Sequence, residues 1–128
     1  MNKIKNEIIS SATSGIEESQ PDTIKQRYRF GPDFIGFSGH FPGNPILPAF
    51  VQILTALTLT EIYKGRPLKA ASVEKAKFRI PLQPDQEIEV TCRQLTVGEL
   101  TGCDARLTVS EGLAASFRIS FPAKEDSQ

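Results

Sequence analysis

One apolar segment in the middle of the chain constrains the fold more than any other feature. Residues 48–63 place Phe, Val, Ile and Leu around most of a helical cylinder, and charge appears only at Glu61 and at Lys64, which directly follows the segment. Pro48 suits the first position of a helix and Gly65 suits its stop. A helix that is apolar on nearly all sides is buried. The sequence therefore predicts one buried helix around which the other elements pack.

The sequence on both sides of this helix is typical of β-strands. Alternating polarity predicts a strand at 23–30 before the helix and four after it, at 70–80 (with a bulge), 87–95, 100–109 and 113–121. Helices and strands do not alternate, which argues against a doubly wound parallel sheet. We predict an α+β hot-dog fold, a curved antiparallel sheet wrapped around one long buried helix. The residues predicted to face inward are Ile24, Gln26, Tyr28, Phe30, Ile88, Val90, Cys92, Cys103, Ala105, Leu107, Val109, Leu113, Ala115, Phe117, Ile119 and Phe121.

Length and composition indicate a single soluble domain. Of 128 residues, 39% are hydrophobic, and 15 basic residues balance 15 acidic ones. Zero net charge argues against a bulk nucleic-acid binder or anionic-membrane binder. No apolar run reaches the roughly 20 residues of a membrane span, and no signal peptide is visible. We expect a cytoplasmic protein with a hot-dog domain at 23–122, a peripheral N-terminal segment at 1–22 and a charged tail at 123–128.

Histidine and cysteine are scarce. His40 is the single histidine, and Cys92 and Cys103 are the two cysteines. A closed zinc site needs four such ligands at short spacings, so we predict no metal site. The two cysteines could face each other across a turn near Gly98, so a disulfide is conceivable, whereas a cytosolic compartment favours reduced thiols.

The loop before the helix carries the candidate chemistry. Its His40 has the side chain that titrates nearest to neutral pH. If Pro48 is the first helical residue, Leu47 is the N-cap and offers no oxygen to the first amides. The N–H groups of Ala49 and Phe50 are then free to bind a carbonyl oxygen. A base beside such donors suits proton removal next to a carbonyl, although a lone histidine in such a loop is more often structural.

Two stretches resemble known motifs. FSGHFPGNPILPAFVQI (37–53) resembles the signature F-x-G-H-F-P-x-x-P-[IVL]-x-P-G-V of 3-hydroxyacyl-[acyl-carrier-protein] dehydratases. SVEKAKFRIPLQPDQEIEV (72–90) resembles the second motif of that family, V-[DE]-K-A-[KR]-F-R-x-P-[VL]-x-P-G-D. The Val51-Gln52 pair is similar to the aryl-polyene branch of these dehydratases.

The resemblance implies a homodimer or larger oligomer of hot-dog subunits in fatty acid biosynthesis. The substrate would be a thioester of acyl carrier protein or coenzyme A, and a 3-hydroxyacyl chain would reversibly lose water to give a trans-2-enoyl chain, without a cofactor. His40 would be the catalytic base. The N–H of Ala49, where the family has glycine, would polarise the thioester carbonyl. The residues expected to contact substrate are Phe41, Pro42, Gly43, Pro48, Phe50 and Leu54.

Leu54 departs from the family pattern. It lies fourteen residues after the histidine, where the family has an acidic residue that protonates the departing hydroxide. Glu61 lies about 10 Å further along the helix, too far for a direct hydrogen bond, and only the fold could bring Asp33 or Glu74 near. In the family the histidine and the acid come from opposite subunits, so a heterodimer partner could supply the acid. The alternatives are a non-catalytic thioester-binding or partner subunit and, third, a thioesterase.

Two basic clusters follow the predicted helix. They could form a docking patch for an acidic carrier protein or for nucleotide phosphates. Alternatively, they could be an ordinary solvated face. The clusters are Lys64, Arg66 and Lys69, and Lys75, Lys77 and Arg79.

Overall fold

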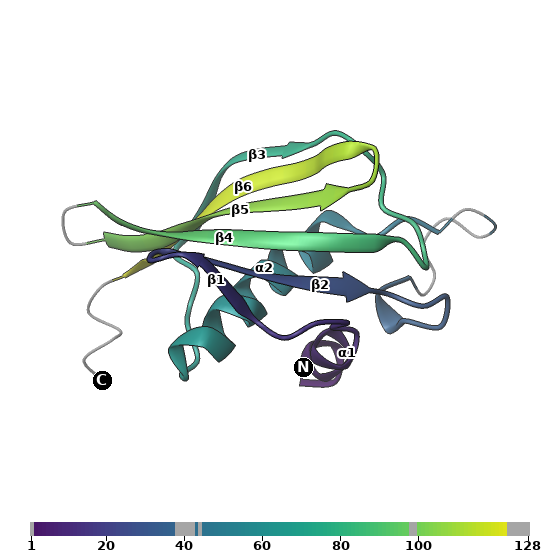
Figure 1. Cartoon of the computed structure of the whole chain (residues 1–128), viewed down its shortest axis with the longest axis horizontal. Coiled ribbons are helices and arrows are strands. Elements are labelled where there is room, and N and C mark those ends of the chain that lie inside the picture. Colours follow the sequence, from purple (N-terminus) through teal and green to yellow (C-terminus); the bar gives the residue numbers. More distant parts are fainter. Residues whose placement is uncertain (1, 38–42, 44, 98–99, 123–128) are drawn as a thin grey trace.

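The computed structural model describes residues 2–37, 43, 45–97 and 100–122. Within them, one antiparallel sheet with the strand order β1-β2-β4-β5-β6-β3 curves over helix α2 (Figure 1). This is the predicted α+β hot-dog arrangement. No helix in the described part of the chain is long and apolar enough to cross a membrane. The elements are α1 (Asn2–Ser10), β1 (Glu17–Gln20), β2 (Thr23–Arg29), the short 3-10 helix η1 (Ile35–Phe37), α2 (Ala49–Lys64), β3 (Ser72–Phe78), β4 (Glu87–Val97), β5 (Leu100–Val109) and β6 (Gly112–Pro122).

The ends of α2 lie within one residue of their predicted positions. Pro48 is the N-cap, with φ −64° and ψ 154°, and the helix begins at Ala49. Gly65 ends it in the left-handed conformation at φ 74°, and its N–H donates to the carbonyls of Glu61 and Ile62. Only glycine adopts this conformation without steric cost, which is why the helix stops there.

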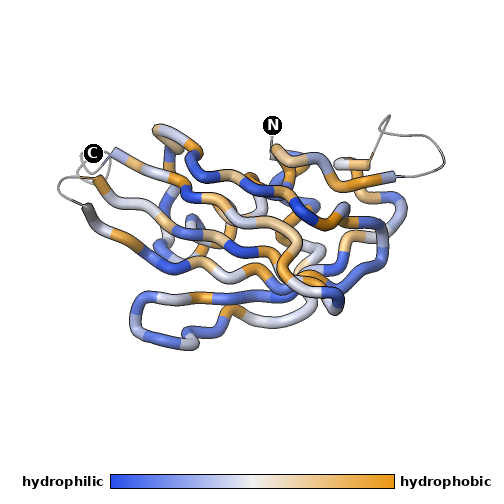
Figure 2. Tube along the Cα trace, turned by 90° about the horizontal axis from the view of Figure 1, so that it is seen from above, coloured by the Kyte–Doolittle hydropathy of each residue, from blue (hydrophilic) through white to orange (hydrophobic). Residues whose placement is uncertain are grey.

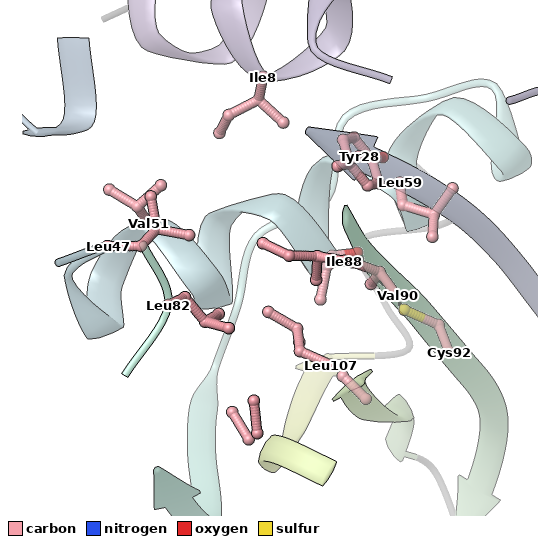
Figure 3. Close-up of a cluster of buried hydrophobic side chains, with 14 of the residues drawn as sticks. Ile8, Tyr28, Leu47, Val51, Leu59, Leu82, Ile88, Val90, Cys92 and Leu107 are labelled. Carbon is pink, nitrogen blue, oxygen red and sulfur yellow. Dashed lines mark hydrogen bonds between the residues drawn. The ribbon is translucent and has the colours of Figure 1, made fainter. Parts of the chain in front are cut away.

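The core lies between α2 and the inner face of the sheet. Polar and apolar positions alternate along the strands (Figure 2), and α2 and the sheet meet in a cluster that includes Leu59, Ile88 and Leu107 (Figure 3). Of the residues predicted to face inward, all are buried except Gln26 and Leu113, which are half-buried.

Ala114 departs from the alternation predicted for β6, because it lies between the inward-facing Leu113 and Ala115 and is nevertheless fully buried. Its carbonyl oxygen accepts the N–H groups of Arg79 and Ile80 at 2.7 and 3.2 Å. The segment that follows β3 therefore covers Ala114, a contact that alternation within β6 does not encode.

The surroundings of α2 also differ from the prediction of a helix buried on nearly all sides. Phe50 and Ile62 are 61% and 44% exposed. Thr55 and Thr60 are buried instead, and their hydroxyls donate to the carbonyls one turn earlier, Val51 at 2.8 Å and Ala56 at 3.0 Å. Satisfied hydroxyls are tolerated in the core, whereas one side of α2 is left without cover.

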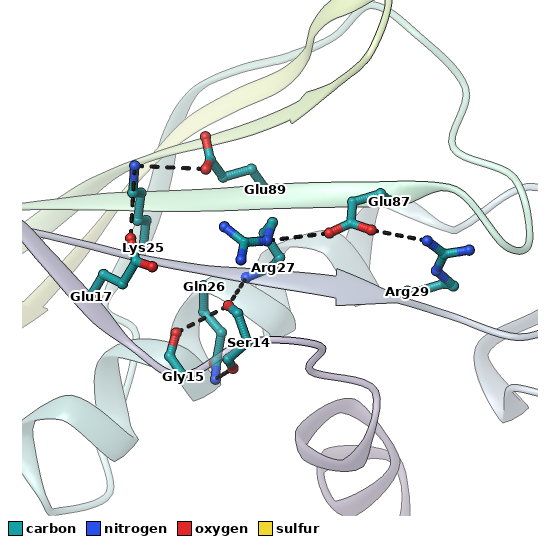
Figure 4. A network of polar contacts seen from close by, with 9 residues as sticks. All are labelled: Ser14, Gly15, Glu17, Lys25, Gln26, Arg27, Arg29, Glu87 and Glu89. Atoms are coloured by element: carbon teal, nitrogen blue, oxygen red, sulfur yellow. Dashed lines mark hydrogen bonds and ion pairs between the residues drawn. The ribbon is translucent and has the colours of Figure 1, made fainter.

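The N-terminal segment, expected to be peripheral, packs onto the domain. Ile8 of α1 is fully buried and points toward the core cluster (Figure 3), and β1 pairs with β2. The connecting segment is held to β2 because the Nε2 of Gln26 donates to the carbonyl of Ser14 (Figure 4). The expected peripheral segment thus contributes both a strand and a core residue.

We predict that Ile8→Ala lowers the free energy of unfolding by about 2–4 kcal/mol, because it removes a fully buried side chain and leaves a cavity. Ile9→Ala is the matched control. Ile9 is 45% exposed, so its replacement should change stability by no more than about 0.5 kcal/mol. Urea unfolding of both variants measures the difference. Equal effects would contradict the packing of α1 described above.

Candidate functional site

The start of α2 presents unpaired hydrogen-bond donors. Pro48 provides no side-chain cap, and its carbonyl accepts the N–H groups of Val51 and Gln52 at 3.1 and 3.2 Å. The N–H groups of Ala49 and Phe50 have no acceptor among the described residues. This matches the prediction of two free amides, although the N-cap is Pro48 and not Leu47. Free amides at a helix N-terminus favour an oxygen that carries or gains negative charge.

A cavity of about 380 Å³ lies at this end of the helix. Pro48 and Ala49 form part of its wall, and no carboxylate of the described chain lines it. Its wall is mostly apolar, with Gln52 and Arg79 as the polar side chains. The other lining residues are Ile46, Leu47, Phe78, Ile80 and Pro81. An apolar cavity with a few polar groups is the usual form of a small-molecule site.

Leu47 is clamped on both sides of its backbone just before the helix. Its N–H donates to the carbonyl of Leu82 at 2.7 Å, and its own carbonyl accepts the Nε2 of Gln52 at 3.0 Å. Leu47 and Leu82 are both fully buried. The residue that leads into α2 is therefore hydrogen-bonded both to the segment before β4 and to the first turn of the helix, next to the free amides.

The structure brings together only some of the predicted site residues. Pro48 and Ala49 line the cavity, whereas His40, Phe41 and Pro42 lie outside the described residues. Gly43 has a φ of 84°, a conformation suited to glycine.

Phe50 and Leu54 do not line the cavity. Phe50 projects into solvent at the open side of α2. Leu54 is half-buried and packs against the core.

None of the three carboxylates considered as substitute acids reaches the cavity. Glu61 accepts the Nζ of Lys5 at 2.8 Å and the N–H of Leu68 at 2.8 Å, so both of its oxygens are engaged. Asp33 and Glu74 are exposed and absent from the cavity wall. Within the described residues, the site thus has donors for a carbonyl but no acid beside them.

The sequence prediction missed Gln52, Phe78 and Arg79 as members of the cavity wall. Gln52 gave a signal, because it is the single amide side chain in the apolar stretch 48–63. Phe78 and Arg79 gave none, because the end of β3 reaches α2 only through the fold.

A basic groove of about 530 Å³ lies on the outer face of the sheet, over β3, β4, β5 and β6. Asp104 is the one carboxylate among its described lining residues. The cations that line it are Lys75, Lys77, Arg79, Arg93, Arg106 and Arg118. Arg79 belongs to this groove and to the cavity at α2 alike, so the two meet at the end of β3.

Ion pairs divide these cations into two groups. Asp104 accepts hydrogen bonds from the Nε of Arg118 at 2.7 Å and from the Nη2 of Arg93 at 3.4 Å. The Arg118 guanidinium holds the pKa of Asp104 below its usual range. The other four cations have no ion pair among the described residues.

On the part of the outer face nearer β2, the basic side chains are paired with carboxylates, unlike most of those in the groove. There Glu87 pairs with Arg27 and Arg29, and Glu89 pairs with Lys25 (Figure 4). Positive charge on this face of the sheet therefore gathers over β3 to β6.

Cys92 and Cys103 are buried free thiols beneath α2. The Sγ of Cys92 contacts the carbonyl of Ala56, and the hydroxyl of Thr60 contacts the Sγ of Cys103, each at 3.8 Å. A hydrogen bond with Cys103, together with burial, raises the pKa of the Cys92 thiol. Of the two alternatives that the sequence leaves open, the structure thus has the reduced thiols and not the disulfide.

Known proteins resemble this chain in sequence. The 3-hydroxyacyl-[acyl-carrier-protein] dehydratase FabZ of Koribacter versatilis is 38% identical over 96 residues, 66% of this chain and 60% of that protein. The FabZ of Syntrophobacter fumaroxidans is 33% identical over 60 residues, 41% of each chain. The chain thus spans between about two fifths and three fifths of the length of these two relatives.

Solved structures share the fold. The dehydratase heterocomplex ApeI:P from Xenorhabdus doucetiae aligns with a TM-score of 0.75 at 22% identity, over 87% of this chain and 96% of that one. Thioesterase superfamily member 2 from Mus musculus aligns with a TM-score of 0.67 at 13% identity, over 92% and 86%.

The family match covers most of the chain. Residues 16–112 match the ApeI-like family, described as ApeI dehydratase. These residues include both motifs, the start of α2 and five of the six strands in full. The chain therefore belongs to the ApeI-like dehydratase family of hot-dog proteins.

Proposed function

We propose that the chain is a dehydratase of 3-hydroxyacyl thioesters, which removes water reversibly to give trans-2-enoyl thioesters. The observation that carries this proposal is the free amide of Ala49 at the start of α2, in the wall of a mostly apolar cavity. Membership of the ApeI-like family supports it. The FabZ relatives are named as dehydratases of 3-hydroxyacyl chains on an acyl carrier protein, which supports the same substrate class here.

The proposed reaction assigns each step to a group. His40 removes a proton from C2 of the acyl chain, and the electron pair of that C–H bond forms the C2–C3 double bond. The C3–O bond breaks, and the departing hydroxide takes a proton from an acid and leaves as water. The thioester oxygen gains negative charge as the proton leaves C2, and the N–H of Ala49 stabilises that charge.

The acid is the part that this chain does not supply at the usual position. Leu54 cannot donate a proton, and Glu61 is engaged by Lys5 and Leu68. We therefore propose that a second hot-dog subunit completes the site. The ApeI:P dehydratase, which shares the fold, is itself a heterocomplex. In a homodimer of this chain, the base and the amide alone would support slow turnover.

The open edge of the sheet is the proposed contact for that second subunit. β3 pairs with β6 on one side and with no described strand on the other. Val73 and Phe78 of β3 are 40% and 44% exposed, and Phe50 at the start of α2 is 61% exposed. An unpaired strand edge beside exposed apolar side chains favours association with another chain.

The basic groove is the proposed docking surface for the carrier. It meets the cavity at Arg79, and Lys75, Lys77 and Arg106 add positive charge without ion pairs among the described residues. Lys75 has a φ of 56° at the bulge in β3, a left-handed conformation that disfavours side-chain-bearing residues. This charge suits an acidic carrier protein, whose thioester arm would then lie beside the start of α2.

A pair of substitutions at Leu54 tests the reaction. We predict that Leu54→Glu raises the rate of crotonyl-thioester hydration by about 10²- to 10⁴-fold, because a carboxylic acid at this position would act as general acid in the site that two subunits form together. Leu54→Gln has the same size without an acidic proton and should give no increase. The assay uses thioesters of carrier protein and of coenzyme A.

The rates of wild type and of Leu54→Glu are compared with that of His40→Ala, the inactive reference. This change should abolish turnover in the wild-type chain and in the Leu54→Glu variant. If folded Leu54→Glu stays at the level of His40→Ala, the dehydratase proposal fails, and a role as a thioester-binding partner subunit takes its place.

A charge reversal tests the docking surface. We predict that Lys75→Glu combined with Lys77→Glu weakens binding to an acyl carrier protein at least 10-fold, and that wild-type binding weakens as salt rises. Lys69→Glu, outside the groove, is the control and should have little effect. Surface plasmon resonance measures the affinities. An equal loss in the control would contradict docking at the groove.

A further inference from the structure

Gln52 keeps one buried polar atom without a partner. Its side chain is 4% exposed, and its Oε1 atom has no hydrogen bond among the described residues. An unpaired buried acceptor costs about 1–3 kcal/mol, and folded proteins keep few of them. Gln52 also lines the cavity at the start of α2. A buried acceptor held unpaired in the wall of a cavity points to a donor that binds there.

The orientation of the Gln52 amide is fixed by its neighbours. Its Nε2 donates to the carbonyl of Leu47 at 3.0 Å, so turning the amide over would bring two acceptors together. The Leu47 backbone is itself held in place, because its N–H donates a hydrogen bond to the carbonyl of Leu82. The unpaired end of the Gln52 amide is therefore an acceptor and not a donor.

The polar groups of the cavity select the chemistry of its ligand. Ala49 and Gln52 lie three residues apart and so on the same side of the helix. The first offers an N–H donor and the second an acceptor, in a wall that is otherwise mostly apolar. A matching ligand has a hydrogen-bond acceptor and a hydroxyl or amine donor close together on an apolar chain.

We propose that the Oε1 of Gln52 accepts a hydrogen bond from the 3-hydroxyl of the acyl thioester while the N–H of Ala49 binds its carbonyl. The inference rests on the proposed function and names the group that distinguishes its substrate. One methylene separates the carbonyl carbon from the hydroxyl-bearing carbon, so both groups fit one short site. Gln52 is thus a positioning residue.

This contact has a direction that suits the elimination. A hydroxyl that donates its hydrogen to Oε1 turns its lone pairs away from Gln52, toward the proton that it receives when the C3–O bond breaks. The enoyl product has no hydroxyl and loses the contact. Gln52 itself gives up no proton, so it does not replace the missing acid.

The test compares two ligands that differ by one oxygen atom, 3-hydroxybutyryl-pantetheine and butyryl-pantetheine. Isothermal titration calorimetry measures the affinity of the full chain for each. We predict that wild type binds the hydroxy compound about 10-fold more tightly, as expected for one hydrogen bond to a buried acceptor. Gln52→Met should bring the ratio of the two affinities to about one. A change in folding would weaken both ligands together and leave that ratio unchanged.

Gln94→Met is the matched control. Gln94 also has buried, unpaired side-chain atoms but lies on β4, outside the cavity wall. It should keep the wild-type ratio. If Gln52→Met does not fold, Gln52→Asn withdraws the acceptor by one methylene and should lower the same ratio.

Two outcomes would overturn the inference. If both thioesters bind and Gln52→Met keeps the wild-type ratio, Gln52 does not contact the hydroxyl, while the proposed function stands. If wild type binds neither thioester, the proposed function fails and this inference fails with it.

Discussion

Burial of α2 against the inner face of a single sheet is the constraint on which the rest of the structure depends. Each fully buried aliphatic side chain contributes about 1.5–3 kcal/mol, and the inward rows of β2, β4, β5 and β6 supply most of these contacts. The sheet covers one side of the helix and α1 contacts another. The side that carries Phe50 and Ile62 stays open, which leaves this surface and the start of the helix available for binding.

The chemistry at the start of α2 follows from how the chain enters the helix. Pro48 gives no side-chain cap, and the clamp on Leu47 holds the first turn in place. The free donors belong to the backbone, and the hydrogen bonds beside them join the Leu47 backbone to Leu82 and to the Gln52 side chain. A catalytic acid would have to come from a side chain, and Leu54 is apolar. The described site is suited to polarising a carbonyl but incomplete for breaking a C–O bond, which accounts for the proposed second subunit.

The parts of the fold that could be predicted are those with a strong local period. The strands over 87–95, 100–109 and 113–121 alternate clearly, and their inner faces were confirmed. The free amides were also predicted correctly despite a shift of one residue in the N-cap, because neither Leu47 nor Pro48 has a capping oxygen. The burial of Ile8 was missed, because α1 is short and is held by residues far along the chain. The role of Gln52 was missed too, because the orientation of its amide depends on the clamp at Leu47.

The strand order has a consequence for how the chain folds as it is synthesised. β3 ends at Phe78, yet its only described neighbour in the sheet is β6, which begins at Gly112. During translation β3 therefore leaves the ribosome before β6 has been made, and both of its edges stay unpaired until β6 emerges. Such non-local pairings slow folding and expose strand edges to other chains. In the emerging chain, Lys75 and Lys77 would act as gatekeepers against premature pairing with other polypeptides, because charged side chains on an exposed strand oppose aggregation.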